Sequence, residues 1–185
     1  MEKKKYFPAL LLIFIVGGLD AYCYLLHDGM FAAMQTGNMI QIAIRLASGR
    51  YTEIGKYLLT ILAFIIGVVC AYFLARLKRF EVITISIALV CYAVGLVLPL
   101  GTLNVLANLI MSFGVSLQLQ VIKSINGYTV ATTMCTGNLR GFSECLSGFI
   151  TSKDKKHCMG MLIYSTLILS FMAGVFVVAL IINLG

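Results

Sequence analysis

The pattern of hydrophobic and polar residues divides the chain into apolar runs that are separated by short polar or basic links. The clearest apolar runs cover residues 6–26, 57–75, 82–98, 103–122 and 160–184. As helices, these runs approach or reach the length that crosses the ~30 Å hydrocarbon core of a bilayer. Two other segments, residues 29–47 and 128–150, are only moderately apolar. The pattern predicts an all-α, polytopic transmembrane helix bundle.

A short polar motif occurs once in each of the two moderately apolar segments. The triplets Thr36-Gly37-Asn38 and Thr136-Gly137-Asn138 lie 100 residues apart (136 − 36). A repeat at this spacing indicates duplication of a whole structural unit. We therefore expect two internal repeats, of about residues 6–77 and 103–184, joined by a connector helix over residues 82–100, in a 3+1+3 plan of segments.

The glycines of the two triplets, Gly37 and Gly137, are each followed by asparagine and predict that the helix is broken there or re-entrant. A broken helix exposes N–H groups with partial positive charge, which transporters use to hold a substrate near the midplane. Another interpretation is that Thr and Asn hydrogen-bond between helices while glycine permits close packing, as Gly137 and Gly141 would.

Two topologies remain open from the sequence. If both motif segments cross the bilayer, the chain has seven spans and the two triplets are parallel. If both segments are re-entrant, the chain has five full spans and the halves are inverted repeats. The distribution of Lys and Arg fits both topologies about equally well.

The composition indicates one membrane domain over residues 1–185. The chain is 61% hydrophobic and only 11% charged, and its mean hydropathy is +1.00, which leaves no room for a soluble enzyme module. The net charge of +7 comes from Lys and Arg clusters at the ends of the apolar runs. This placement is typical of membrane anchoring with the N-terminus in the cytoplasm and does not indicate a nucleic-acid partner.

Three polar side chains stand out in the predicted helices. Asp20 lies 16 residues before Thr36 (36 − 20), and Gln118 lies 18 residues before Thr136 (136 − 118). An acid inside a span costs about 2.5–3.5 kcal/mol on insertion scales and is expected to face a partner or a cavity; alternatively, Asp20 lies near the interface and is wetted. Arg140 has Glu144 one turn away as a neutralising partner, or serves Asp20 or an anionic substrate.

Catalytic chemistry finds little support in the sequence. The six cysteines form no Cys-x-x-Cys pair, and no metal-ligand grouping or glycine-rich phosphate loop is visible. Carboxylates inside apolar segments are limited to Asp20 and Glu144, without a nucleophile and base beside them. We expect no enzyme activity, no cofactor and no metal site.

Several stretches together resemble the YoaK-type family of small bacterial multi-pass membrane proteins, a family of unknown function. These stretches are Gly18-Leu19-Asp20-Ala21, residues 34–38, Ser116-Leu117-Gln118 and residues 132–140. The resemblance covers nearly the whole chain and implies a location in the bacterial cytoplasmic membrane. It implies no substrate and no catalytic residues.

Two functional hypotheses follow. The first is a transporter or channel for a small solute or ion, with its site between the two repeats. Its pathway would be lined by residues from both halves, namely Asp20, Thr36, Gly37, Asn38, Gln118, Thr136, Gly137, Asn138 and Arg140. The second is a structural or accessory membrane protein in which the polar motifs only pack helices. A homodimer suits both hypotheses, because a bundle of this size makes a thin wall for a pore.

Overall fold

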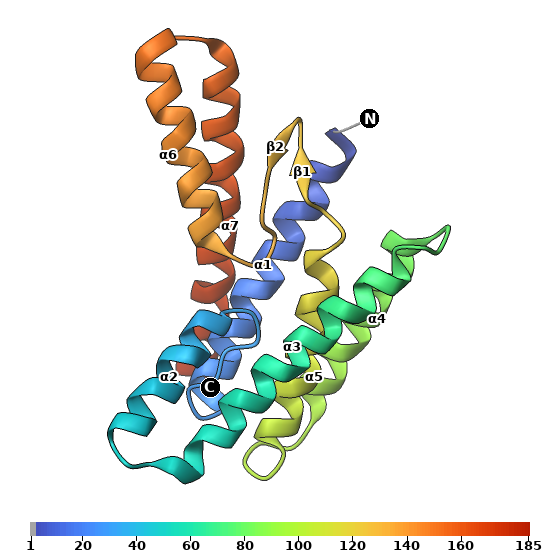
Figure 1. Cartoon of the computed structure of the whole chain (residues 1–185), viewed down its shortest axis with the longest axis vertical. Helices are drawn as coiled ribbons and strands as arrows, with labels where there is room; N and C mark the ends of the chain where they lie inside the picture. The colour runs from blue at the N-terminus through green and yellow to red at the C-terminus, as the bar shows by residue number, and fades with distance from the viewer. Residues whose placement is uncertain (1–2) are drawn as a thin grey trace.

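The protein is a bundle of helices with one short hairpin (Figure 1). The structure is a computed structural model that describes residues 3–185, so the first two residues, which precede the basic cluster at residues 3–5, lie outside the described part. The elements within it are α1 (Lys3–Leu26), α2 (Gln35–Ala47), the 3-10 helix η1 (Tyr51–Glu53), α3 (Ile54–Leu74), α4 (Phe80–Val97), α5 (Asn104–Leu119), β1 (Ser124–Ile125), β2 (Tyr128–Thr129), α6 (Cys135–Ser152) and α7 (Lys155–Leu184). The predicted helical architecture is confirmed.

The hairpin of β1 and β2 corrects the all-α expectation. Ile125 pairs with Tyr128 in antiparallel register, and the connecting Asn126 and Gly127 have φ values of 51° and 82°. Asn-Gly is the preferred pair for a two-residue turn with positive φ at both positions. The turn lies in the link between the predicted segments 103–122 and 128–150, and its strands have only two residues each.

Four helical segments are long and apolar enough to cross a membrane: Lys5–Leu26, Tyr51–Leu74, Phe80–Val97 and Lys155–Leu184. Helix α5 is shorter, with 16 residues, and it carries the largest share of buried side chains. Its polar residues are therefore shielded by α3 and α4, which pack along it. The membrane character expected from composition agrees with these four helices.

Helices α2 and α6 run in opposite directions from the middle of the molecule (Figure 1), and α2 is the shortest α-helix of the described residues. Helix α2 has 13 residues, so it is about 20 Å long, which is too short to cross a bilayer core of ~30 Å. Figure 1 shows α2 and α6 beginning near the middle of the molecule and running to opposite ends. Each is preceded by an extended segment, residues 30–34 and 130–134.

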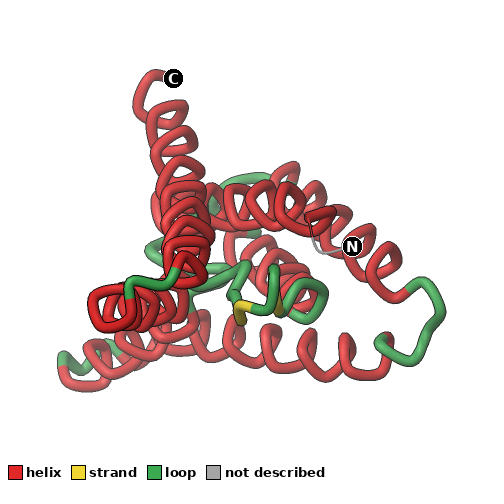
Figure 2. Tube along the Cα trace, turned by 90° about the horizontal axis from the view of Figure 1, so that it is seen from above, coloured by secondary structure: helices red, strands yellow, loops and turns green. Residues whose placement is uncertain are grey.

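The closest helix crossings join the first helix of one half to the last helix of the other. Helix α1 packs along α7, and α5 packs along α3. A Cβ on Gly174 would overlap the carbonyl of Phe14, and a Cβ on Gly67 would overlap the side chain of Ser116. Both glycines are required because a side chain there would separate the helices. Seen from above, the hairpin lies inside the outline of the helices and the end of α7 projects outward (Figure 2).

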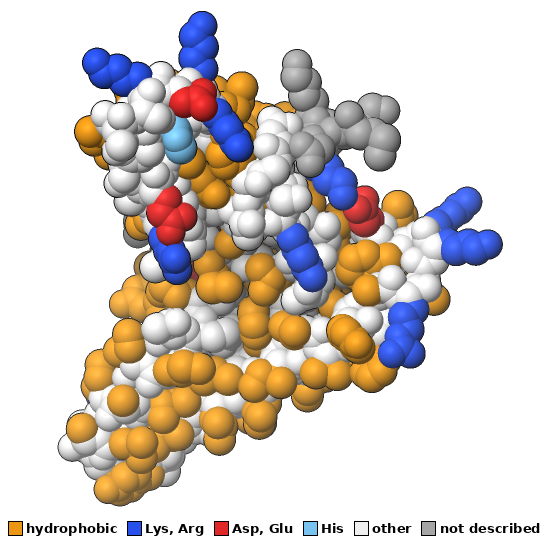
Figure 3. All heavy atoms as spheres, turned by 45° about the horizontal axis from the view of Figure 1, so that its top comes forward, with side chains coloured by type: hydrophobic (Ala, Val, Ile, Leu, Met, Phe, Trp, Pro, Cys, Tyr) orange, Lys and Arg blue, Asp and Glu red, His pale blue; other side chains and the backbone are white. Residues whose placement is uncertain are grey.

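The outer surface is mostly hydrophobic. Leu, Ile, Val and Phe side chains of α3, α4 and α7 are widely exposed, among them Ile66, Val90 and Phe176. Figure 3 shows that the charged side chains of the displayed face gather toward one end, while hydrophobic side chains cover much of the rest. This distribution matches a bundle whose sides contact lipid.

The crossing of α1 and α7 gives a test of the packing. Gly174→Ala should lower the melting temperature in detergent, because its methyl group meets backbone rather than a movable side chain, and overpacking of this kind typically costs about 1–3 kcal/mol. Gly55→Ala is the matched control, since nothing lies within 4 Å of that Cβ. Equal melting temperatures for the two variants would contradict the crossing.

Candidate functional site

Asp20 lies where the starts of α2 and α6 approach each other. Its side chain is buried, and its Oδ1 accepts the backbone N–H of Ala33 at 2.7 Å. Ala33 belongs to the extended segment that precedes α2, so the carboxylate stands at the positive end of that helix. Asp20 is also within electrostatic range of Cys135, the first residue of α6. The acid singled out in the sequence therefore belongs to the junction of the two short helices.

The two asparagines of the motifs share two equivalent hydrogen bonds, each with the residue seven positions earlier. Asn38 accepts the N–H of Phe31 at 3.0 Å and donates to the carbonyl of Phe31 at 2.9 Å. Asn138 accepts the N–H of Ala131 at 3.0 Å and donates to its carbonyl at 2.8 Å. Each asparagine thus acts as a strand partner for the extended segment seven residues before it. Both side chains are buried and are committed to the local fold in this conformation.

The remaining motif residues lie on the outside or serve packing. Thr36 and Thr136 are exposed. A Cβ on Gly37 would lie 2.8 Å from the ring of Phe31, which is too close. A Cβ on Gly137 would lie 3.9 Å from Ala131, which leaves room for a side chain. The packing interpretation therefore fits Gly37 but not Gly137.

Gln118 and Arg140 lie in different surroundings. Gln118 is fully buried, accepts the hydroxyl of Tyr92 at 2.8 Å and donates to the carbonyl of Leu12 at 3.3 Å. Arg140 donates to Glu144 at 2.8 Å on the exposed side of α6. The structure therefore brings Asp20 and Asn38 to the start of α2, places Gln118 between α1, α4 and α5, and leaves Arg140 on the outer surface.

A buried polar stripe on α5 was not predicted. Its members recur every four residues and all are buried: Asn104, Asn108, Ser112 and Ser116. The spacing itself was the available signal, since residues four apart share one face of a helix.

The stripe is part of a hydrogen-bonded chain that leads to the first motif. Asn108 Nδ2 donates to Thr60 Oγ1 at 2.9 Å, and Ser112 Oγ donates to the carbonyl of Thr60 at 3.2 Å. Gln35 Nε2 donates to Ser112 Oγ at 3.0 Å, and Asn38 Nδ2 donates to Gln35 Oε1 at 2.9 Å. Polar side chains thus connect α5 and α3 with the start of α2.

The opposite end of the stripe reaches the end of α1. Asn104 Nδ2 donates to the carbonyl of Leu26 at 3.1 Å and to Asp28 Oδ2 at 3.4 Å. Lys56 Nζ and Tyr57 Oη donate to the carbonyl of Asp28. The stripe therefore makes two separate sets of hydrogen bonds, one from Asn104 to the end of α1 and one from Asn108 and Ser112 toward the start of α2.

Several buried polar atoms have no hydrogen-bond partner among residues 3–185. They include Asn108 Oδ1 in the stripe and the hydroxyls of Thr132 and Thr133 before α6. These two threonines occupy the positions that Ala32 and Ala33 hold before α2. A buried polar group without a partner costs about 1–3 kcal/mol, so these atoms call for water or a ligand.

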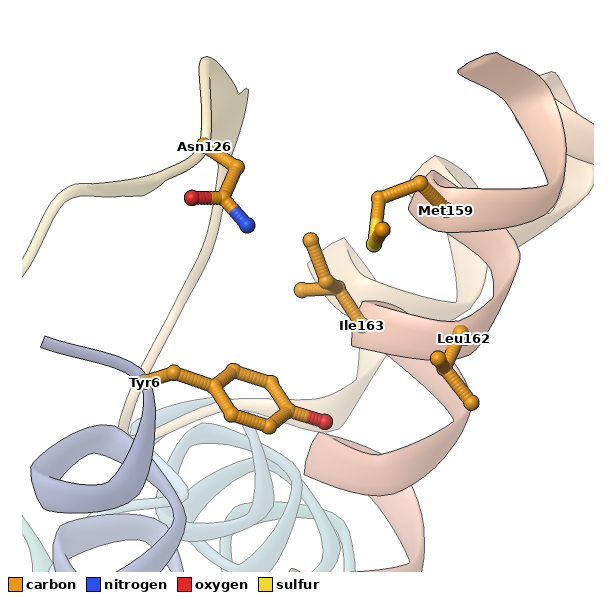
Figure 4. A pocket seen from close by; sticks show the side chains of 5 residues that line it. All are labelled: Tyr6, Asn126, Met159, Leu162 and Ile163. Atoms are coloured by element: carbon orange, nitrogen blue, oxygen red, sulfur yellow. The ribbon is translucent and has the colours of Figure 1, made fainter. Parts of the chain in front are cut away.

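A cavity near the start of α1 offers less to a polar solute. It has a volume of about 330 Å³ and is lined by Tyr6, Asn126, Met159, Leu162 and Ile163. Figure 4 shows these side chains around an open gap between the hairpin, α1 and α7. The lining is mainly apolar, and Tyr6 Oη is already hydrogen-bonded to Thr166, so the cavity suits an acyl chain better than an ion.

Residues 8–184 match the sequence model of a family described as protein of unknown function (DUF1275). The chain belongs to this family. The match covers almost the whole chain and confirms the resemblance drawn from the paired motifs. Comparison of this DUF1275 member with curated proteins and with solved structures gives no match. The assignment of function must therefore rest on the geometry.

Loss of either motif asparagine should destabilise the protein. Asn38→Ala and Asn138→Ala each leave a backbone N–H and a carbonyl without their partner, at about 1–3 kcal/mol for each unsatisfied group. We expect a clear fall in melting temperature in detergent for both variants. Asn183→Ala, at an exposed position near the end of α7, should leave the melting temperature unchanged. A fall for only one of the two motif variants would contradict their equivalent roles.

His27, just after the end of α1, makes stability depend on pH. Its side chain is buried, and its Nδ1 has no hydrogen-bond partner within residues 3–185. Burial lowers the pKa of His27, and the nearby Asp28 opposes this only in part. The folded state therefore binds fewer protons than the unfolded state once the pH falls through the unfolded pKa of about 6.5.

Stability should consequently be full above pH 7 and decrease toward pH 5. The change is measured by thermal unfolding in detergent over this pH range. His27→Gln should flatten the dependence, whereas His157→Gln should retain it. A wild-type melting temperature that is constant from pH 7 to pH 5 would exclude this role of His27.

Proposed function

We propose that the protein is a transporter or channel for a small solute or ion, with its site at the junction of α2 and α6. The observation that carries the proposal is the set of buried polar groups that converge there. They comprise Asp20, the hydrogen-bonded chain from Asn108 to Asn38, and the hydroxyls of Thr132 and Thr133, which have no partner within residues 3–185. A bundle that needed only tight packing would gain nothing from unpaired polar atoms in its interior.

We further propose that the halves are inverted repeats with re-entrant α2 and α6. Three features support this topology: α2 is too short to cross, α2 and α6 run to opposite ends of the molecule (Figure 1), and Asn38 and Asn138 share two equivalent hydrogen bonds. Under this topology the five full spans are α1, α3, α4, α5 and α7. Re-entrant helices that meet near the midplane are used in channels and transporters to bind ions and small solutes.

The packing supports a motion between two groups of helices. Helix α7 packs with α1 and α6, while α3 packs with α2 and α5 and α4 packs with α5; contact between α1 and α5 is much smaller. The hydrogen bonds that link the two groups include Ala33 to Asp20, Gln118 to Leu12 and Asn104 to Leu26. Relative rotation of the groups would open the junction from either side, as alternating access requires.

The proposed setting is the cytoplasmic membrane of a bacterium, with the N-terminus in the cytoplasm. In the five-span topology, the basic links at residues 76–79 and 153–156 lie on the same side as the basic head. Clusters of Lys and Arg favour the cytoplasmic side. We propose no catalytic step, because Asp20 has no nucleophile or base positioned with it.

A second candidate is a structural or accessory membrane protein. The observation that favours it is that Asn38, Asn138 and Gln118 are fully buried and hydrogen-bonded within the bundle. In that case the polar groups stabilise the fold alone. The two candidates differ in whether the protein moves a solute across a sealed bilayer.

Flux measurement in liposomes separates the candidates. Purified protein should carry protons, an alkali cation, a small anion or a small neutral solute, each followed with an entrapped indicator. Asp20→Asn should reduce the flux at least tenfold while keeping the Ala33 hydrogen bond, because the amide oxygen still accepts. Thr132→Val with Thr133→Val should also reduce flux, and it should raise or maintain thermal stability, because it removes two unpaired hydroxyls.

Thr136→Val is the matched control, since Thr136 has the same side chain on the exposed side of α6. It should leave flux near the wild-type level. The transport proposal fails if no tested solute moves, and the site assignment fails if flux persists in Asp20→Asn and in the double valine variant.

A further inference from the structure

One face of α6 is polar and exposed along the length of the helix. Its members are spaced by four, three, one and three residues, which places them on a single side: Thr136, Arg140, Ser143, Glu144 and Ser147. We call this set the polar face of α6. The side chains of Arg140 and Glu144 are 82% and 62% exposed. The opposite side of the helix packs on α7, where Gly141 and Cys145 lie against Tyr164 and Gly160.

A helix in contact with lipid normally exposes apolar side chains, whereas α6 exposes polar ones. In the proposed function, α6 is a re-entrant helix, and the inference below rests on that placement. Helix rise puts Arg140 about 8 Å and Glu144 about 13 Å from the start of α6 near the middle of the molecule. Ionic side chains at such depth are costly unless protein or water covers them. The neighbouring exposed surface of α7 is apolar, with Leu162 and Leu169 outermost.

We propose that a second copy of this chain covers the polar face of α6, forming a homodimer about a two-fold axis. The face carries one cation and one anion a single turn apart. Two parallel copies in contact can therefore exchange partners, so that Arg140 of each copy pairs with Glu144 of the other, as flanking charges do between helices of a coiled coil. Self-complementarity of this kind is what a symmetric interface requires.

The small residues of the face permit close approach. The hydroxyls of Ser143 and Ser147 donate to the carbonyls of Leu139 and Ser143, each at 2.9 Å. These side chains therefore need no partner across the interface and leave a shallow surface, which is typical of helix contacts in membranes. The face has no net charge, so it offers little to a partner of one charge sign, and its cation and anion are complementary to those of its own copy.

Charge exchange between two variants tests the dimer without ambiguity. Arg140→Glu places two acids on the face, and Glu144→Arg places two bases there. Each variant alone should dimerise at least tenfold more weakly than the wild type, because like charges oppose each other. When the two variants are co-expressed with different tags, a heterodimer should form, since each acid then meets a base of the other copy. The pair within each helix remains broken, so recovery reports contact between copies.

Oligomeric state is measured on the full chain in lipid nanodiscs and by native mass spectrometry. Glu81→Lys is the control, because it breaks the exposed pair with Lys5 elsewhere on the surface and should leave dimerisation unchanged. Ser147→Trp adds bulk to the face without altering charge and should also weaken the dimer.

A wild type that is monomeric at all concentrations overturns the proposal, as does a dimer that resists Arg140→Glu and Ser147→Trp or a failure of the mixed variants to pair. A face that is covered by water or by an unrelated protein would give the monomeric result. Oligomeric state is measured without any flux. The dimer proposal can therefore be disproved while the transport proposal holds, and the transport proposal can be disproved while the dimer proposal holds.

Discussion

Backbone N–H and C=O groups that leave a helix inside an apolar bundle must find partners within the protein, because lipid supplies none. Residues 30–34 and 130–134 are such segments, and the rest of the site depends on how they are held. Asn38 and Asn138 each satisfy one N–H and one C=O of the extended segment seven residues earlier. An amide side chain is suited to this because it donates and accepts at once. The asparagine of each Thr-Gly-Asn motif therefore allows the backbone to be non-helical inside the bundle, because it satisfies an N–H and a C=O group that no helix pairs.

The two halves use this device with different neighbours, and the difference bears on function. Before α2, the segment has alanines at positions 32 and 33, and Asp20 accepts the N–H of Ala33. Before α6, threonines replace both alanines, and their hydroxyls find no partner in residues 3–185. The polar stripe of α5 likewise serves only the first half. The two corresponding segments therefore differ in polarity: alanines stand before α2, whereas buried threonines with hydrogen-bonding capacity that the described residues leave free stand before α6.

Much of the architecture could be predicted because the bilayer constrains it strongly. The long apolar runs gave the spans, and the repeated motif located both short helices. The start of α2 at Gln35 could not be placed, because apolar periodicity does not reveal that Asn38 turns back to Phe31. The hairpin at Asn126-Gly127 lies in the link between two predicted segments, where the Asn-Gly turn signal marked the turn but the two-residue strands beside it were too short to show a pattern.

The site was predicted less well, and the reasons are physical. Placing the carboxylate of Asp20 inside an apolar span costs free energy in any fold, so the sequence alone was enough to single this residue out. Whether Asn38 faces a solute or its own backbone is decided by chain geometry over seven residues, which composition does not encode. The stripe on α5 was visible in principle, since Asn104, Asn108, Ser112 and Ser116 recur at helical spacing. Its partners, Thr60 and Gln35, come from elements far apart in the sequence and required the structure.

The glycine crossings and the sparse links at the junction favour motion between groups of helices over motion within them. Gly174 against Phe14 and Gly67 against Ser116 hold α1 to α7 and α3 to α5 at a distance that permits no intervening side chain. Such crossings resist sliding, because packed surfaces have few alternative arrangements. By contrast, the junction is joined by the hydrogen bond from the Ala33 N–H to Asp20. Under the proposed function, water or a solute that supplies an equivalent hydrogen bond would take its place when the two groups of helices move apart.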